Sequence, residues 1–292
     1  MERNQSLRFS IVIPAYNEAG YIASTIKSIQ NQDFRGNYEI IVVDNNCSDG
    51  TASIAKKLGA KVVEEKQAGV CFARQKGSEI ATGQIVISSD ADTIYPKDWL
   101  TKIDRQFKAD ATIVAVAGPC QYTRGPLWGE VFSKNLFKLI DVSFKLTGNV
   151  FYATATNIAF KKTEWADYNT SLTQGGDELD LIRNLKKRGK VVFLGDNVVF
   201  TSSRRLVHGF WYNVFMSFLT YYLLAYYLNR LFGHRIMGSA PAFRDEFKPR
   251  LFTLTQVCVA SLVLPAFIIY ALVGSLSLQH SLAIMLNLPL GN

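Results

Sequence analysis

The sequence predicts an α/β fold, in which helices flank a mixed, mainly parallel sheet, followed by hydrophobic helices at the carboxyl end. Three observations predict this arrangement. Short β-branched runs alternate with helical patterns over roughly the first 120 residues, which is typical of βα units on a parallel sheet. Polar clusters follow three of these runs directly. Two long apolar segments occupy most of the last third of the chain.

The individual elements follow from local patterns of apolar residues. In the first half we predict strand Phe9–Ile13, helix Ala19–Asn31, strand Glu39–Val43, a helix ending at Lys57, strand Lys61–Glu64, helix Gly69–Thr82 and strand Gln84–Ser89. In the second half we predict helix Leu127–Leu146, strand Tyr152–Phe160, helix Asp177–Arg188 closed by Gly189, and strands Val191–Leu194 and Val198–Ser202. Lysines interrupt the apolar pattern of Leu127–Leu146, so this helix is predicted to pack on the domain or to lie on a membrane or acceptor surface.

The polar clusters Pro14–Glu18, Asp44–Asp49 and Asp90–Asp92 each follow a predicted strand. Ligands of such sheets bind beyond the carboxyl ends of the strands. Because loops at one edge of a sheet can converge, we expect the three clusters to form one site.

The chain divides into a domain over residues 1–206 and a membrane-associated region over residues 207–292. The second region comprises an aromatic, apolar helix (207–232), a basic linker (230–250) and an apolar segment (251–279). All seven charged side chains of this region lie between Arg230 and Arg250. A membrane span needs about 20 apolar residues, so both apolar segments are long enough. A buried helix of a soluble protein is the alternative.

The number of spans stays open. If both segments crossed, the basic linker would face away from the cytoplasm, against the positive-inside tendency. Aromatic residues favour the interface, so we expect the first segment in the headgroup zone and Leu251–Tyr270 crossing or dipping in. The amino terminus carries no apolar signal segment, and the four cysteines lack metal or disulfide spacing. We therefore expect a membrane protein whose first domain is cytoplasmic.

The net charge of +8 fits simple solubility or attraction to anionic lipid. The chain has no basic run of the kind that binds nucleic acid. The first strand is followed by Pro-Ala-Tyr-Asn-Glu instead of GxGxxG, and no GxxxxGK[ST] occurs, which argues against a dinucleotide-binding dehydrogenase and a P-loop NTPase.

Three motifs together carry a family resemblance. Ser10–Glu18 (SIVIPAYNE), Val42–Thr51 (VVDNNCSDGT) and Asp90-Ala91-Asp92 occur in this order, each closing a predicted strand. Over about residues 8–205 the chain thereby resembles family 2 glycosyltransferases, which have the GT-A fold. The resemblance implies an inverting enzyme that transfers a sugar from a nucleotide-diphosphate donor, linked to UDP, GDP or dTDP.

Chemistry independently favours a cation beside Asp90 and Asp92. A diphosphate leaving group gains negative charge as the sugar bond breaks, and two carboxylates one residue apart offer the hard oxygen ligands that suit Mg²⁺ or Mn²⁺. Following the family pattern, Asp92 would coordinate the metal, while Asp90 would contact the ribose or a metal-bound water. The alternative for Asp90-Ala91-Asp92 is a solvated turn.

The resemblance also implies a nucleoside site. Pro14, Ala15 and Tyr16 match the loop that packs around the nucleoside, and Asp44 matches the position that hydrogen-bonds the base. Glu18 is predicted to contact the base or ribose, or only to begin its helix. Arg74 is predicted to lie near the donor or in a surface ion pair. We expect Ser48 and Asp49 to cap the following helix.

The segment Gly175–Leu181 (GGDELDL) resembles the family motif that holds the catalytic base, with its acid pair inverted. Register favours Glu178, but Asp177 is an alternative base. Either carboxylate would take the proton from the acceptor hydroxyl, and the purely structural alternative is a charged helix start. After the last strand, Arg205 or Arg204 is predicted to reach the diphosphate, with His208 less favoured and lipid headgroups as the other partner of one arginine.

A lipid or lipid-linked glycan is the expected acceptor, because a soluble acceptor would not require membrane attachment. Polyprenyl phosphate is the narrower alternative, although an ionised phosphate would need no base. The chain lacks the Gln-x-x-Arg-Trp motif of processive synthases. A non-catalytic scaffold with the GT-A shape is the remote alternative.

Overall fold

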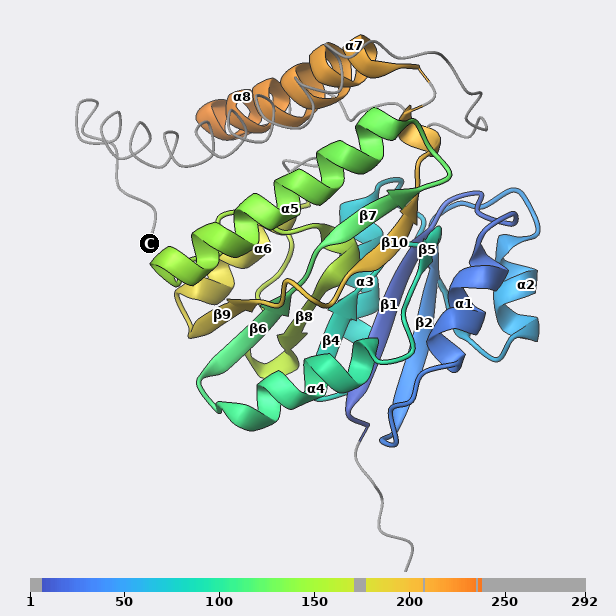
Figure 1. The fold of residues 1–292 in the computed structure, drawn as a ribbon. Helices are drawn as coiled ribbons and strands as arrows, with labels where there is room; N and C mark the ends of the chain where they lie inside the picture. Colours follow the sequence, from blue (N-terminus) through green and yellow to red (C-terminus); the bar gives the residue numbers. More distant parts are fainter. Residues whose placement is uncertain (1–6, 171–176, 207, 235, 238–292) are drawn as a thin grey trace, which may run out of the picture.

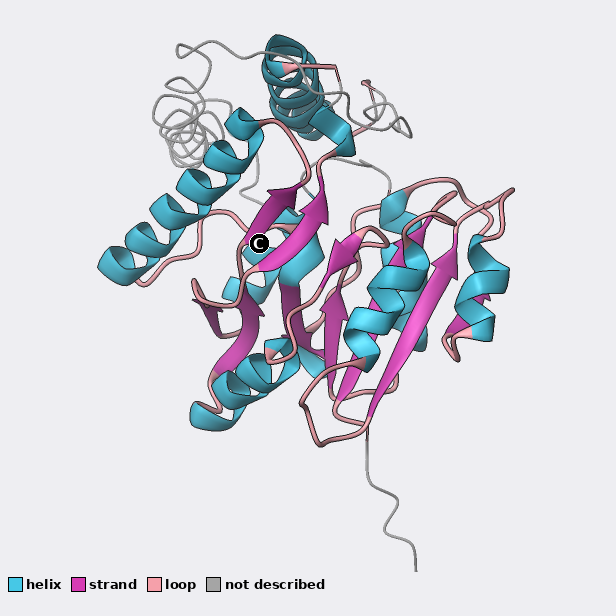
Figure 2. Cartoon of the chain, turned by 45° about the vertical axis from the view of Figure 1, so that its right-hand side comes forward, coloured by secondary structure: helices cyan, strands magenta, loops and turns pink. Residues whose placement is uncertain are grey.

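A computed structural model describes residues 7–170, 177–206, 208–234 and 236–237. Its centre is a seven-stranded sheet with helices on both faces (Figures 1 and 2). In spatial order the strands are β3 (Lys61–Glu64), β2 (Tyr38–Asp44), β1 (Phe9–Ala15), β4 (Ile85–Ser88), β8 (Ile158–Lys161), β6 (Ile113–Ala117) and β9 (Lys190–Phe193).

The strand directions confirm the predicted mixed, mainly parallel sheet. Strand β1 runs parallel to β2 and β4, β2 runs parallel to β3, and β6 runs parallel to β9. Only β8 runs against its two neighbours, β4 and β6. The carboxyl ends of β1, β2 and β4 therefore meet at one edge, where the three polar clusters follow.

A second, three-stranded sheet lies beside this edge (Figure 1). It comprises β5 (Thr93–Ile94), β10 (Val199–Ser202) and β7 (Cys120–Thr123), with β10 antiparallel to β5 and parallel to β7. Strand β5 begins directly after Asp92, and its Thr93 pairs with Thr201. The smaller sheet thus brings the chain that follows β10 to the Asp90–Asp92 loop.

The helices of the domain bury one face against the sheets. Helix α1, for example, buries Ile22, Ile26 and Ile29, at helical spacing. Helix α3 approaches β1 closely at Gly77, where an added Cβ would lie 2.3 Å from Cγ1 of Val12. The helices are α1 (Ile22–Gln30), α2 (Thr51–Lys57), α3 (Val70–Ile80), α4 (Trp99–Ala109), α5 (Leu127–Thr147) and α6 (Asp177–Lys186), with 3₁₀ turns η1 (Ala155–Asn157), η2 (Lys162–Glu164) and η3 (Arg204–Leu206).

Helix α5 confirms the predicted helix at Leu127–Leu146, and it packs on the domain. Trp128, Leu136, Phe137 and Ile140 are buried, and the ring of Phe137 stacks on that of Phe193 at 6.4 Å. Burial of these side chains accounts for their helical spacing without a membrane surface.

The structure differs from the sequence prediction in several elements. Helix α4 and strands β5, β6 and β7 were not predicted, and the predicted strand over Tyr152–Phe160 is the turn η1 followed by the short β8. The turn is fixed by Asn157, whose side-chain amide donates to the carbonyl oxygens of Pro119 and Asn197. Gly189 does not take a left-handed cap conformation. Instead, an added Cβ there would lie 2.4 Å from Val114, so Gly189 allows close packing.

The predicted aromatic helix is present as three successive segments, α7 (Phe210–Tyr212), the π-helical η4 (Asn213–Leu224) and α8 (Ala225–Phe232). Arg230 of α8 forms an ion pair with Asp180 of α6, which ties the two helices together. Among the described residues, no helix combines the length and the hydropathy that crossing a membrane requires. Most of the predicted basic linker and the whole apolar segment 251–279 lie outside the described residues, so the membrane helices stay a prediction.

Candidate active site

The loops after β1 and β2 lie against each other, as the sequence predicted. Asp49 accepts hydrogen bonds from the backbone N–H of Ala19 (3.0 Å) and of Thr51 (2.9 Å), the first residue of α2. The hydroxyl of Thr51 in turn accepts the N–H of Glu18 at 2.8 Å. Asn17, in the left-handed region with φ of 55°, accepts the N–H of Ser48 at 2.8 Å. The first two polar clusters therefore form one rim, in which Asp49 bonds the first N–H of α2, while the N-cap position itself is Gly50 and Ser48 bonds Asn17 instead of the helix.

Asp44 ends β2 and is half-buried. Its carboxylate accepts the N–H of Cys47 at 2.8 Å, which fixes the turn. The next residue, Asn45, accepts the N–H of Gly69 at 2.8 Å and donates to the carbonyl oxygens of Glu65 and Gln67. The start of α3 is thereby attached to the same rim. A contact of Asp44 with a nucleoside base stays a prediction.

Arg74 of α3 is buried beneath the Asp90–Asp92 loop. It donates from Nη2 to Asp90 at 2.8 Å and from Nε to the hydroxyl of Ser88 at 3.2 Å. Its side chain is 6% exposed, so the interpretation as a surface ion pair is wrong. Two further bonds hold the loop, because the carbonyl of Ala91 accepts from Thr25 and the hydroxyl of Tyr95 accepts the N–H of Asp90.

Arg204 links the rim to the same loop. Its guanidinium binds Glu18 through two hydrogen bonds, from Nη1 at 2.7 Å and from Nη2 at 2.6 Å. Nη2 also lies 2.9 Å from Oδ2 of Asp92, and the guanidinium sits 4.8 Å from the centre of the Tyr21 ring. The side chains of Glu18, Asp92 and Arg204 are 7%, 13% and 9% exposed. One buried arginine is therefore shared by two carboxylates.

The electrostatics of this cluster are unusual for a surface loop. Burial raises the pKa of Asp92 to about 6, against the opposing effect of Arg204, and the charges of Asp90 and Glu18 raise it further. Burial alone would lower the pKa of Arg204, but its hydrogen bonds to Glu18 and the charges of Asp92 and Glu18 outweigh this and raise it. Three carboxylates thus lie around two buried guanidinium groups, and the exposed Arg205 adds a further positive charge near Asp92.

The donor set suits a hard divalent cation. Asp90 and Asp92 supply carboxylate oxygens, which Mg²⁺ and Mn²⁺ prefer. Within the described part of the chain, no three acidic, histidine or cysteine side chains are grouped so that they could hold an ion by themselves. Mg²⁺ is commonly bound by one or two carboxylates together with substrate phosphates. Asp90 and Asp92 fit the protein's share of such a site.

The remaining predicted residues are placed as follows. Pro14 and Ala15 are buried at the end of β1, whereas the Tyr16 ring projects from the rim and is 46% exposed. Arg205 is exposed and lowers the pKa of Asp92 by its charge, but Arg204 makes the ion pair with Asp92.

The candidate base Glu178 is buried in the first turn of α6. The Asp177 side chain lies outside the described residues, so the choice of base stays a prediction.

The sequence analysis did not identify Tyr21, Tyr95 or Thr201 as part of this cluster. Thr201 lies 3.4 Å from Oδ1 of Asp92 through its hydroxyl. Tyr95 follows Asp92 after two residues, Tyr21 follows Glu18 after two residues, and Thr201 is the last residue but one of a predicted strand. Proximity to a motif or to a strand end was therefore the available signal.

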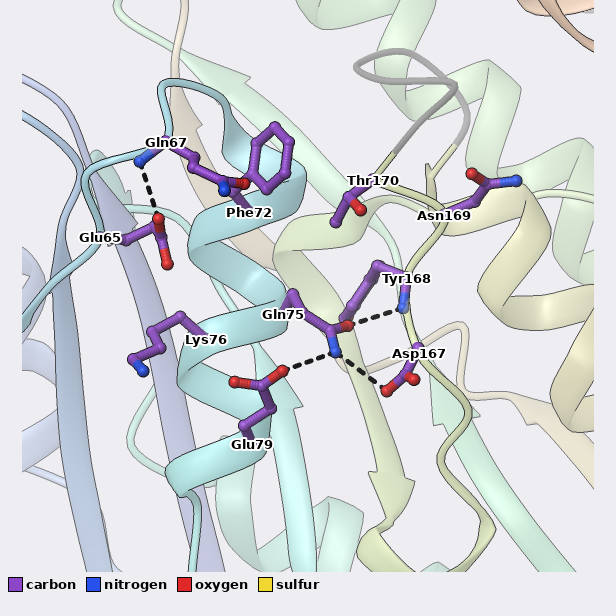
Figure 3. A pocket seen from close by; sticks show the side chains of 10 residues that line it. All are labelled: Glu65, Gln67, Phe72, Gln75, Lys76, Glu79, Asp167, Tyr168, Asn169 and Thr170. Carbon is purple, nitrogen blue, oxygen red and sulfur yellow. Dashed lines mark hydrogen bonds between the residues drawn. The ribbon is translucent and has the colours of Figure 1, made fainter. Parts of the chain in front are cut away.

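A separate hollow of about 520 Å³ lies between α3 and the segment Asp167–Thr170 (Figure 3). Phe72, Gln75, Lys76 and Glu79 of α3 form one wall, and the segment Asp167–Thr170 forms the other, held by the hydrogen bond from the Tyr168 N–H to Gln75. None of the predicted site residues lines it. We place the candidate site at the Asp92 cluster instead, because Glu18, Asp90 and Asp92 converge there with Arg74 and Arg204.

A mixed sheet with an Asp-Ala-Asp loop at its carboxyl edge, backed by two buried arginines, defines a glycosyltransferase of the GT-A type. A family model describes this class directly, and it matches residues 10–164, more than half of the chain. The chain belongs to glycosyl transferase family 2.

Individual relatives agree with this assignment. The glycosyltransferase AglE of Haloferax volcanii is 33% identical over 100 residues, which are 32% of this chain and 33% of the relative. The dolichol-phosphate mannosyltransferase of Pyrococcus furiosus is 30% identical over 112 residues, 37% of this chain and 32% of the relative. The matches thus cover about a third of the length of these curated relatives.

Among solved structures, glucosyl-3-phosphoglycerate synthase from Mycobacterium tuberculosis, in complex with Mn²⁺, UDP-glucose and phosphoglyceric acid, superposes with a TM-score of 0.51. It is 22% identical to this chain, and the match covers 68% of this chain and 72% of the other. This likeness shows the shared fold.

Proposed function

We propose that the protein is an inverting, metal-dependent glycosyltransferase that moves a sugar from a nucleotide-diphosphate donor to a lipid or lipid-linked glycan at a membrane. The observation that carries the proposal is the cluster of Asp90, Asp92, Glu18, Arg74 and Arg204 at the carboxyl edge of the sheet. The solved relative with bound UDP-glucose and Mn²⁺ supports the donor class and the metal.

In this proposal the rim binds the nucleoside. The exposed ring of Tyr16 offers a face for the base, and the Asp44 carboxylate, fixed by its bond to Cys47, accepts a hydrogen bond from a ring N–H. Uracil and guanine both present such a group. The rigid contacts between the β1 and β2 loops keep this surface preformed.

The leaving diphosphate faces the Asp90–Asp92 loop. Asp92, with Asp90, would hold Mg²⁺ or Mn²⁺, which supplies positive charge to the diphosphate as the sugar bond breaks. Arg204 and the exposed Arg205 add positive charge at the same place. Glu178 takes the proton from the acceptor hydroxyl as that oxygen attacks the anomeric carbon, and Asp177 is the alternative base.

The acceptor is proposed to lie at a lipid surface. The helix over residues 210–232 exposes large apolar side chains, among them Trp211 (50%), Phe215 (54%), Leu231 (64%) and Phe232 (55%). Aromatic and apolar residues of this kind favour the membrane interface. The proposed location is a membrane with the catalytic domain on its cytoplasmic side.

A narrower candidate is transfer to polyprenyl phosphate. The named activity of the Pyrococcus furiosus relative favours it. An ionised phosphate needs no base, so a requirement for Glu178 would count against this candidate.

The proposal is tested by incubating membranes that contain the protein with radiolabelled UDP-, GDP- and dTDP-sugars and Mn²⁺. We expect one donor to label a lipid-extractable product, and expect Asp92→Asn to abolish labelling. An acid-labile product would identify polyprenyl phosphate as the acceptor. If Asp92→Asn labels lipid as well as the wild type does, the metal-assisted mechanism is wrong, and if neither protein labels lipid with any donor, a scaffold remains.

A further inference from the structure

We infer that Glu18 is a positioning residue that sets how strongly Asp92 binds a divalent cation, by keeping Arg204 paired when a cation takes its place at Asp92. This inference rests on the proposed function. The starting observation is that a single nitrogen, Nη2 of Arg204, contacts Oε1 of Glu18 at 2.6 Å and Oδ2 of Asp92 at 2.9 Å. The two carboxylates therefore compete for one donor group.

The competition is uneven in favour of Glu18. Glu18 receives two hydrogen bonds from the guanidinium in a fork geometry, which is the strongest arrangement for this pair of groups, whereas Asp92 has only the shared nitrogen. Glu18 is also fixed in place. Its N–H donates to Thr51, and its carbonyl accepts the N–H groups of Tyr21 and Ile22 at the start of α1.

A cation that binds at Oδ2 of Asp92 takes the place of Arg204 on that oxygen. With Glu18 present, Arg204 keeps two hydrogen bonds after the exchange and stays buried with a partner. Without the charge of Glu18, Asp92 alone would pair with the Arg204 guanidinium. A cation that binds Asp92 would then leave that buried guanidinium without a charged partner. The arrangement thus makes the exchange at Asp92 easier.

Two variants separate this role from simple charge. Glu18→Gln keeps the shape and removes the charge, and we expect roughly tenfold weaker Mn²⁺ binding, the size of coupling seen between contacting charged residues. In an Arg204→Gln background the competitor is gone, so we expect Glu18→Gln to cost only the effect of its charge, a clearly smaller loss of Mn²⁺ affinity than in the wild-type background. If Glu18 acted only through its negative charge, both backgrounds would show the same loss.

The experiment titrates the purified proteins with Mn²⁺ alone and follows free Mn²⁺ by electron paramagnetic resonance. Glu18→Asp, which keeps the charge, is the conservative variant and should recover much of the affinity. It replaces Glu18→Gln if that variant folds poorly, because the part of the Mn²⁺ affinity that Glu18→Asp fails to recover should be lost only while Arg204 is present. Circular dichroism reports folding throughout.

The outcomes separate the two levels of the argument. Equal losses in the wild-type and Arg204→Gln backgrounds, or no loss in either, would overturn the role of Glu18 while leaving Asp92 as a ligand. If Asp92→Asn binds Mn²⁺ as well as the wild type does, the metal part of the proposed function fails, and the inference fails with it.

Discussion

The substitution Arg204→Met tests the buried charge cluster most severely. It removes the guanidinium that holds Glu18 and Asp92 together and replaces it by an apolar side chain of similar length. Both carboxylates then stay buried at 7% and 13% exposure without that partner. The expected result is a large loss of stability, because an uncompensated buried charge is costly.

The magnitude follows from the number of contacts. Removal of one partner from a buried ion pair costs about 3–5 kcal/mol, and Arg204 has three such contacts. For a domain of this size, a loss of about 1 kcal/mol lowers the Tm by roughly 2–4 °C, so we expect the Tm to decrease by roughly 10 °C.

The loss of stability should also depend on pH. Arg204 lowers the pKa of Asp92, so in the variant this pKa rises above its value of about 6. A raised carboxyl pKa means that stability is lost as pH increases, and the deficit should therefore be larger at pH 8 than at pH 5.

The measurement is urea unfolding of the purified protein at both pH values. Arg205→Met is the matched control, because Arg205 is adjacent and exposed, and surface substitutions usually change stability by less than about 0.5 kcal/mol. Two results would refute this role of Arg204. Arg204→Met and Arg205→Met could be equally stable, or the stability lost by Arg204→Met could be the same at both pH values. In either case Arg204 would not compensate the charges of Glu18 and Asp92.

Three further predictions concern packing and charge elsewhere. Gly77→Ala should lower the free energy of unfolding by about 1–3 kcal/mol, measured with urea, because the new Cβ would lie 2.3 Å from Val12. Gly20→Ala is the control and should cost little, because its Cβ would meet nothing within 4 Å. Equal losses in the two variants would contradict the close packing of α3 on β1. Burial raises the pKa of Glu39, but hydrogen bonds from Ser10 and Thr82 and the charge of Lys61 outweigh it, so this pKa is below its ordinary 4.5. Stability from Glu39 should therefore be present above pH 4.5 and decrease as the pH falls below it, and Glu39→Gln should remove part of that decrease in acid titrations of unfolding. Asp180→Asn weakens the ion pair with Arg230, and proteolysis between α6 and α8 should become faster, while an unchanged cleavage rate would show that the pair does not hold α8.

The parts of the fold that could be predicted are those in which local pattern and tertiary environment agree. Strand β3 has the predicted bounds, and β1 differs only at its end, because buried β-branched runs need no distant partner to be recognised. Strands β5 and β7 have two and four residues and are stabilised mainly by pairing with β10, which no local pattern reveals. Residues 113–117 are continuously apolar, and periodicity alone does not assign such a run.

The same distinction applies to the site. The positions of Asp44, Asp90 and Asp92 followed from strand ends, which the sequence marks clearly. Which of two adjacent arginines faces Asp92 depends on the 3₁₀ turn Arg204–Leu206, whose direction is set by the pairing of β10 with β5. The sequence analysis considered both arginines and favoured Arg205. The sharing of Arg204 between Glu18 and Asp92 spans 186 residues and could not be found from spacing.

We propose that a nucleotide-diphosphate sugar binds where the Asp90–Asp92 loop meets the rim formed by the β1 and β2 loops. Hydrogen exchange measured by mass spectrometry, with and without Mn²⁺ and the donor that labels lipid, locates the bound donor on the chain. We expect slower exchange in peptides covering residues 14–18, 44–49, 90–92 and 200–206. Protection confined to the hollow between α3 and Asp167–Thr170, with no change in those four segments, would contradict it.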